Sequence, residues 1–443
     1  MVQSIPEWLI AVCKTIESSG GKGFLVGGCV RDRLLNYPVK DYDIEVYGLP
    51  SGQLRELLER HGSVNTVGEH FAVYKLRPKA NASIEIDVSL PRHESKLRPG
   101  HRGFLIEGNP WMPFHEAASR RDFTINAILQ DPFTQTILDP FRGVEDLANK
   151  RLQAVNHSTF RDDSLRVLRA AQLASRYQLS ISPETIAMCQ QTSLGDIPKE
   201  RVRKEIEKLL LLSPKPSIGL DYCLKLGIIS QVLPMLWDLH SSMISENPYT
   251  KEAFWDYTLI SIDRGKKNTK ELSEPEKLSV LLSILGLGLS TTRLIDLLDS
   301  LGIYTYKGHN IRNQVLVIIS THLPAYKIFY QSKKQNFEFS YLKRLARIID
   351  IKLLICFLKS IFHTPESEYL SWAEEKVKMF SLLQNPFQDL LKGRHILEVG
   401  IPPGPHIKSI INQIHELEID GKVINLEDAK LLAKTLYKKR ISE

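Results

Sequence analysis

The spacing of apolar residues changes near Val155. Before it, short runs rich in β-branched and aromatic residues alternate with helix-like stretches. The runs predict strands at residues 24–26, 41–47, 71–76 and 84–90. Helices are expected at residues 30–35, directly after the Gly27-Gly28 turn, and at residues 52–60, with Ser51 as the N-cap. This pattern predicts a small α+β head with a mixed sheet.

From about Thr159 onward, apolar positions recur with the period of an α-helix and strand signals almost vanish. Helices are predicted at residues 163–175, 184–191, 199–212 and 218–226, among others, with breaks at Pro214, Pro216, Pro234, Pro324 and Pro386. The basic stretch 264–270 is expected to be a polar loop. We therefore divide the chain into the head (1–155) and an all-α remainder, comprising a neck (156–215), a body (216–385) and a tail (386–443).

Composition narrows the class of protein. The 443 residues are 43% hydrophobic, which is ordinary for a globular protein of two or more domains. The first residues lack a basic segment before their apolar stretch and no apolar run could cross a bilayer, so neither secretion nor membrane insertion is expected. Five scattered cysteines without a C-x-x-C pair indicate reduced thiols in a cytoplasm. The net charge of +7 weakly favours a polyanionic partner.

Two glycines and two carboxylates in the head have a spacing that suits phosphate chemistry. Gly27 and Gly28 end a predicted strand and open a helix, so their backbone N–H groups can approach a phosphate, with Arg31 in the first turn. Asp41 and Asp43 lie two apart on the next predicted strand, so both side chains leave one face, roughly 6–7 Å apart. Each feature alone is common in turns and caps. Their combination predicts a nucleotide site.

Two carboxylates at this spacing can share a pair of Mg²⁺ ions, which would activate a 3′-hydroxyl and stabilise a pyrophosphate leaving group. A third carboxylate on a neighbouring strand would complete such a site. Asp87 is our choice, and Glu85 on the same face is its competitor. We therefore expect Asp41 and Asp43 to bind metal, and these two with Asp87 to be catalytic.

The run FLVGGCVRDRLLNYPVKDYDIEVYGLP resembles the first signature of the class II tRNA nucleotidyltransferase and bacterial poly(A) polymerase family, a branch of the polymerase-beta-like nucleotidyltransferases. Further signatures follow in the order of that family: RRDFTINA from Arg120, DPFRG from Asp139, DDSLRVLRA from Asp162 and ERVRKE from Glu200. The resemblance covers about residues 22–240. It implies a nucleotidyltransferase with CTP and ATP as substrates, Mg²⁺ as cofactor and an RNA 3′ end, above all that of tRNA, as acceptor.

The predicted helix near Asp163 carries a carboxylate and two guanidinium groups at i, i+3 and i+6, namely Asp163, Arg166 and Arg169. Asp163 can accept from an exocyclic amine and Arg166 can donate to the adjacent ring nitrogen, a pattern that C and A share. The resemblance implies that this stripe selects CTP and ATP. Two positions depart from the family: Asp162 replaces its usual Glu, and Gln172 replaces a common Arg, so Gln172 receives no binding role.

The resemblance also implies roles for other segments. Arg121 would face the triphosphate and Asp122 a ribose hydroxyl, so the expected nucleotide-binding set is Gly28, Arg31, Arg121, Asp122, Asp163, Arg166 and Arg169. Residues 92–114 take the place of the flexible loop that helps this family switch from CTP to ATP. Segments 254–258 and 281–286 resemble the frame of an HD-type phosphohydrolase whose His and His-Asp ligands are absent here. The tail is similar to the region that contacts the tRNA elbow.

These observations predict a CCA-adding tRNA nucleotidyltransferase. An A-adding enzyme and a poly(A) polymerase are the alternatives, because the head sequence hardly encodes the acceptor or the stopping point. A non-catalytic RNA-binding protein on the same fold is disfavoured by the intact pair Asp41 and Asp43. A phosphoester hydrolase is disfavoured by the missing HD ligands. The sequence does not predict an oligomeric state.

Overall fold

The computed structural model describes residues 4–39, 41–66, 73–96, 104–241, 253–334, 339–362, 367–379 and 389–442. Its contacts divide the chain into two compact units, Met1–Asp238 with Asp299–Gly302, and Leu239–Leu298 with Ile303–Glu443. The expected head and neck share the first unit, and most of the expected body and tail falls in the second. The four-part division itself stays a prediction.

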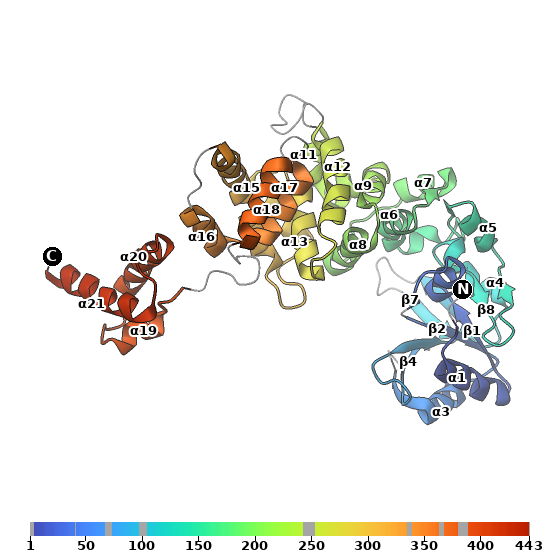
Figure 1. Cartoon of the computed structure of the whole chain (residues 1–443). Helices are drawn as coiled ribbons and strands as arrows, with labels where there is room; N and C mark the ends of the chain where they lie inside the picture. Colours follow the sequence, from blue (N-terminus) through green and yellow to red (C-terminus); the bar gives the residue numbers. More distant parts are fainter. Residues whose placement is uncertain are drawn as a thin grey trace. The chain divides into compact units, whose positions relative to one another are not determined.

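A seven-stranded mixed sheet forms the centre of the head (Figure 1). Its order is β3-β4-β5-β2-β1-β8-β9; β2 and β5 run parallel, and the other neighbours pair antiparallel. The strands are β1 (Lys22–Val26), β2 (Asp43–Tyr47), β3 (Gly62–Thr66), β4 (Val73–Pro78), β5 (Ile86–Ser89), β8 (Leu129–Gln130) and β9 (Ile137–Leu138). The expected fold class, a mixed-sheet α+β head followed by helices, is confirmed.

Strand β1 is covered on both faces, so its sequence is apolar without alternation. One face meets α1 (Glu7–Ser18), which in turn packs against α3 (Ser51–His61). The other face meets α4 (Phe114–Ser119) in a cluster that includes Phe24, Val26, Tyr47 and Met112. This burial fixes the end of β1, from which the Gly27-Gly28 turn leads into α2 (Gly28–Leu34).

Helices after the sheet complete the first unit. The longest are α6 (Leu165–Tyr177) and α8 (Lys199–Leu212), and α6 packs against both α8 and α9 (Pro216–Lys225). The shorter elements are η1 (Thr124–Asn126), α5 (Gly143–Ala148), β10 (Arg151–Leu152), η2 (Phe160–Asp162), β11 (Ser180–Ile181), α7 (Pro183–Gln190), α10 (Ile228–Val232) and η3 (Pro234–Leu236), and α11 (Trp237–Ser241) spans the border between the units.

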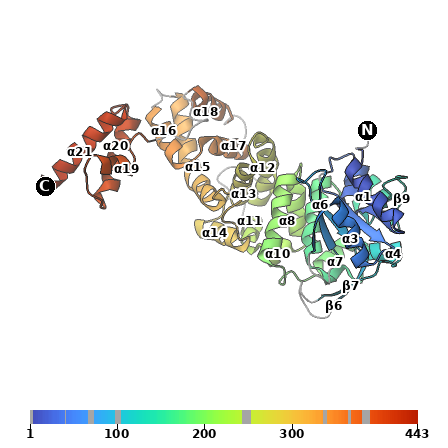
Figure 2. The same cartoon turned by 90° about the horizontal axis from the view of Figure 1, so that it is seen from below.

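The second unit is helical wherever the structure assigns it regular elements. Its first helices are α12 (Phe254–Asn268), α13 (Glu274–Leu285), α14 (Thr291–Ser300), α15 (Ile311–Lys334), α16 (Phe339–Ile348), α17 (Ile351–Ile361) and α18 (Ser367–Met379). The helices α19 (Gly393–Glu398), α20 (His406–Ile419) and α21 (Leu426–Ser442) gather around a core of their own (Figure 2). None of the described helices is both long and apolar enough to cross a membrane. All five cysteines are free.

Four local predictions were wrong. Residues 264–268 continue α12 instead of forming a loop, because its buried face extends to Gly265, which packs against Ile284. Pro324 lies inside α15 between the buried residues His322 and Ala325, whose packing offsets the hydrogen bond that proline cannot donate. Ser51 is the first residue of α3, whose N-cap is Pro50 without a side-chain cap. Asp41 precedes β2 rather than lying in it.

Candidate active site

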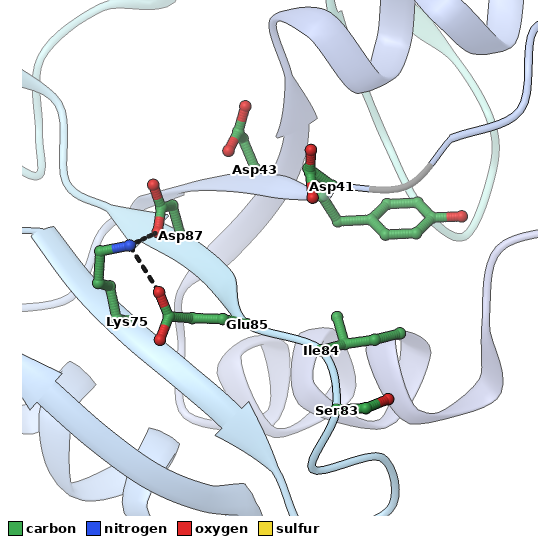
Figure 3. Close-up of a pocket in the computed structure, with 8 residues that line it drawn as sticks. Asp41, Asp43, Lys75, Ser83, Ile84, Glu85 and Asp87 are labelled. Atoms are coloured by element: carbon green, nitrogen blue, oxygen red, sulfur yellow. Dashed lines mark hydrogen bonds and ion pairs between the residues drawn. The ribbon is translucent and has the colours of Figure 1, made fainter. Parts of the chain in front are cut away.

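The parallel pairing of β2 and β5 brings two of the predicted carboxylates together. Asp43 opens β2 and is paired in register with Asp87 of β5, so the two side chains leave adjacent strands, which are about 4.8 Å apart. Asp41 lies just before β2 and lines the same pocket, which has a volume of about 420 Å³ (Figure 3). All three carboxylates of the expected catalytic set therefore line one pocket.

Glu85, the competitor for the third position, forms ion pairs with two basic residues of β4. Its Oε1 lies 2.6 Å from Lys75 Nζ and its Oε2 lies 3.0 Å from Arg77 Nε. In Figure 3 its carboxylate turns toward Lys75, whereas Asp87 lies beside Asp43. Lys75 Nζ is also 3.4 Å from Asp87 Oδ1. The register and these ion pairs favour Asp87 over Glu85 as the third carboxylate.

The electrostatics of Asp43 bear on whether this site suits a metal. Burial raises the pKa of Asp43, the nearby Asp87 and Asp41 add to this effect, and Arg121 opposes it, so that the pKa is about 6 in the folded protein. The carboxylates therefore repel one another until a cation joins them. Carboxylate oxygens are the donors that Mg²⁺ prefers in proteins, so the residues present fit this ion.

A second pocket of about 620 Å³ shares Asp41 and Asp43 with the first. Gly27 in its wall has a φ of 70°, a conformation that glycine adopts without strain. A Cβ atom on Gly27 would lie 3.2 Å from Arg121 Nη1, so the turn also lets this guanidinium lie close. The other lining residues are Gly28, Cys29, Arg31, Asp32, Pro38, Arg121, Asp122, Asn126, Arg169, Gln172, Leu173, Arg176, Lys208 and Leu212.

Arg31 is buried in a hydrogen-bond network between α2 and the end of α6. Its Nε and Nη2 donate to Asp32 Oδ1 at 2.9 and 2.8 Å, and its Nη1 donates to Asn126 Oδ1. The Tyr177 hydroxyl accepts from Arg31 Nη2 and donates to Asp32 Oδ1 at 2.7 Å. Arg31 also lies over the Tyr177 ring, 4.3 Å from its centroid. The guanidinium is therefore held rigidly at the wall of the second pocket.

Asp122 joins the same wall to α6. Its Oδ2 accepts from Arg169 Nε at 2.7 Å, and its Oδ1 accepts from Asn126 Nδ2 at 2.9 Å. Burial raises the pKa of Asp122, but Arg169 and these hydrogen bonds outweigh it, so the net shift is downward and the carboxylate is ionised at neutral pH. The structure thus brings Arg121, Asp122 and Arg169 to one pocket, and the roles that the resemblance implies for them stay predictions.

Asp163 and Arg166 are placed differently from the expected stripe. Asp163 precedes α6 in an extended conformation, its Oδ1 accepts from Leu165 N at 3.2 Å, and its Oδ2 lies 3.6 Å from Arg201. Arg166 donates to the carbonyl oxygens of Thr159 and Arg120, at 3.0 and 2.7 Å. Neither Asp163 nor Arg166 is among the described residues that line the second pocket. The premise that both lie on one helical face is wrong, and their base-reading role stays a prediction.

The sequence interpretation missed several side chains of this site. Gln172 and Arg176 continue from Arg169 along α6 at helical spacing and line the pocket, and Lys208 reaches it from α8. Continuing from Arg169 by three and seven residues along the predicted helix would have found the first two. Lys75 carried no sequence signal, because its position beside Asp87 depends on the pairing of β4 with β5.

The expected switching loop at residues 92–114 contains a hairpin. Strands β6 (Arg92–Lys96) and β7 (Phe104–Gly108) pair antiparallel, and residues 97–103 lie outside the described part of the chain. The region is therefore not a loop throughout.

Parts of the chain match known protein families and relatives. Residues 23–153 match the poly A polymerase head domain, and residues 178–239 match the probable RNA and SrmB-binding site of polymerase A. A multifunctional CCA protein of Mannheimia succiniciproducens is 39% identical over 224 residues, 49% of this chain and 50% of that protein. One from Actinobacillus pleuropneumoniae is 34% identical over 276 residues, 60% of this chain and 64% of that protein. The chain thus aligns with about half to two thirds of these relatives.

Solved structures share the fold over nearly the whole chain. The Bacillus stearothermophilus CCA-adding enzyme in complex with CTP has a TM-score of 0.66 at 19% identity, covering 99% of this chain and 100% of that one. The Thermotoga maritima CCA-adding enzyme complexed with tRNA has a TM-score of 0.63 at 19% identity, covering 98% and 97%. The family resemblance drawn from the motifs is confirmed over the head: residues 23–153, which hold the three clustered aspartates, match the poly A polymerase head domain.

Proposed function

We propose that this chain is a CCA-adding nucleotidyltransferase, which adds C and A to the 3′ end of tRNA from CTP and ATP and releases pyrophosphate. The observation that carries the proposal is the cluster of Asp41, Asp43 and Asp87 at the edge of a second pocket walled by Gly28 and Arg121. Carboxylates beside a cationic phosphate pocket are the groups that nucleotidyl transfer requires. The relatives, which are multifunctional CCA proteins, support the same reaction.

The proposed roles follow from the positions of the side chains. Asp41 and Asp43 would hold a pair of Mg²⁺ ions, which when bound supply charge for activating the 3′-hydroxyl and offsetting the leaving pyrophosphate. Asp87 would orient the attacking hydroxyl from the adjacent strand. Gly28, Arg31 and Arg121 would receive the triphosphate, and Asp122 with Arg169 would lie toward the ribose.

The test is incorporation of labelled CTP and ATP with Mg²⁺ into three RNAs: a tRNA that ends before the first C, a tRNA that ends in CC, and an unstructured RNA. We expect two C additions followed by one A on the first tRNA. Addition of A to the CC-ended tRNA alone would identify an A-adding enzyme. Long A tracts on any RNA would identify a poly(A) polymerase, and no incorporation at all would favour a non-catalytic RNA-binding protein.

The proposed base selection gives a second prediction. Removing the carboxylate in Asp163→Ala is expected to raise UTP incorporation relative to CTP by about 10- to 100-fold, since one good base contact is worth roughly 1–3 kcal/mol of discrimination. The measurement is single-nucleotide addition with each of the four nucleotides in competition. If use of CTP and ATP falls equally and the preference among nucleotides is unchanged, the role of Asp163 is structural, namely to accept a hydrogen bond from Leu165 N at the start of α6.

A further inference from the structure

The second acidic residue of β2 is buried behind the active site. Glu45 follows Asp43 by two positions on the strand, so both side chains leave the same face of the sheet. Its solvent exposure is 0%. Burying a carboxylate costs free energy, and an apolar residue at such a position often gives equal or greater stability. Stability alone therefore does not account for an acid at this position.

The carboxylate of Glu45 is shared among three donors. Its Oε1 lies 2.7 Å from Arg120 Nη2 and 3.4 Å from Arg121 Nη2, and its Oε2 accepts from the Tyr47 hydroxyl at 2.8 Å. Burial raises the pKa of Glu45, but Arg121 and Arg120 lower it more strongly, so the net shift is downward. Glu45 is thus an ionised anchor for two consecutive arginines.

Arg120 and Arg121 contact different parts of the first unit. Arg121 lies against the Gly27 turn and lines the pocket that Asp41 and Asp43 share. The carbonyl oxygen of Arg120 accepts from Arg166 Nη2 at 2.7 Å, which ties the same segment to α6. Glu45 therefore connects the strand that carries Asp43 to the cationic wall of the pocket.

We propose that Glu45 is a positioning residue for nucleoside triphosphates. Its negative charge holds the Arg121 guanidinium at the pocket wall, so that the β- and γ-phosphates of either nucleotide meet a preformed cation. This inference rests on the proposed function. It requires that loss of the Glu45 charge weaken binding of the triphosphate part of the substrate, in the same way for CTP and ATP.

The test is Glu45→Gln, which keeps the shape and removes the charge. We expect the KM for both CTP and ATP to rise about tenfold, as for one hydrogen bond to a charged group, with kcat changed far less. In calorimetry the variant should bind CTP about tenfold more weakly and CMP as the wild type does. In the Arg121→Ala background, Glu45→Gln should cause no further loss of CTP affinity, whereas a general structural defect would add to it.

Asp146→Asn is the matched control. Asp146 is a carboxylate of the same unit, 1% exposed and bonded to Thr124 and Arg151, and it does not line either described pocket. We expect this variant to lose thermal stability with an unchanged KM. If Glu45→Gln fails to fold, Tyr47→Phe removes only the hydroxyl that fixes Glu45, and should raise both KM values about two- to threefold.

The outcomes distinguish failure of the role proposed for Glu45 from failure of the proposed function. If the wild type incorporates nucleotides and Glu45→Gln keeps the wild-type KM for both CTP and ATP, the role proposed for Glu45 is overturned and the proposed function stands. The same conclusion holds for Tyr47→Phe if that variant is measured in its place. A wild type that neither binds CTP nor incorporates it would overturn the proposed function first. Equal loss of CMP and CTP affinity would also contradict the inference, because CMP lacks the phosphates that Arg121 is to receive.

Discussion

The Asp43→Asn variant is expected to lose nucleotide incorporation by on the order of a thousandfold or more while remaining folded. The change removes a charge from the carboxylate cluster, and Asn cannot replace Asp43 in its proposed role of holding Mg²⁺ and offsetting the charge of the ion. Single-turnover addition of CMP to tRNA measures the effect, and binding of labelled tRNA should be unaltered. Retained incorporation would refute the assignment of Asp43 as a metal ligand.

The same variant is expected to be more stable than the wild type when Mg²⁺ is removed. Because the pKa of Asp43 is raised to about 6 in the folded state, its ionised form costs stability above pH 6. This penalty disappears as the pH falls from 6 toward 3.8, the ordinary pKa of an aspartate, because the folded state takes up the proton at a higher pH than the unfolded state does. The gain at neutral pH should be roughly 1–3 kcal/mol.

Thermal unfolding in EDTA between pH 5 and pH 8 tests this expectation. The difference in melting temperature between Asp43→Asn and the wild type should be largest at pH 7–8 and shrink toward pH 5. Added Mg²⁺ should raise the melting temperature of the wild type but not that of the variant. A variant less stable than the wild type at every pH would mean that the carboxylate cluster is not under electrostatic strain.

Replacing Asp32 is expected to have the largest effect on stability. Asp32 Oδ1 accepts from Arg31 and Tyr177, and its Oδ2 lies 3.6 Å from Arg176. The side chains of Arg31 and Asp32 are only 6% and 12% exposed. Removing the acid in Asp32→Ala leaves a buried guanidinium without its anion, which should cost about 3–5 kcal/mol.

Urea unfolding followed by circular dichroism measures this loss. Tyr177→Phe is the graded control, because it removes one hydroxyl from the same network and should cost only about 1 kcal/mol. CTP affinity should fall in Asp32→Ala even at low temperature, where the protein stays folded, since Arg31 lines the pocket. An unfolding midpoint equal to that of the wild type would show that Arg31 finds another partner or reaches water.

The sequence by itself predicted the parts of the site that depend on local order. The Gly27-Gly28 turn lies between a strand and a helix, because short-range geometry decides where such a turn forms. Asp43 lies on the next predicted strand, and both Asp41 and Asp43 line the same pocket as this turn. The helix at residues 199–212 has the predicted bounds, because its apolar period is regular. Asp122 and Arg169, both expected near the nucleotide, line the same pocket, although the ion pair between them was not predicted.

Other features depended on which segments pack together. Asp87 rather than Glu85 neighbours Asp43 because β5 pairs with β2 in one register and β4 supplies Lys75 and Arg77 to Glu85. The basic stretch 264–268 is helical because Gly265 packs on Ile284, a contact that its charge does not reveal. In the sequence DYDIE, nothing distinguishes Glu45 from an ordinary polar residue, and only the fold shows that it is buried against Arg120 and Arg121. Register and burial arise from distant pairing, so only the tertiary structure could decide them.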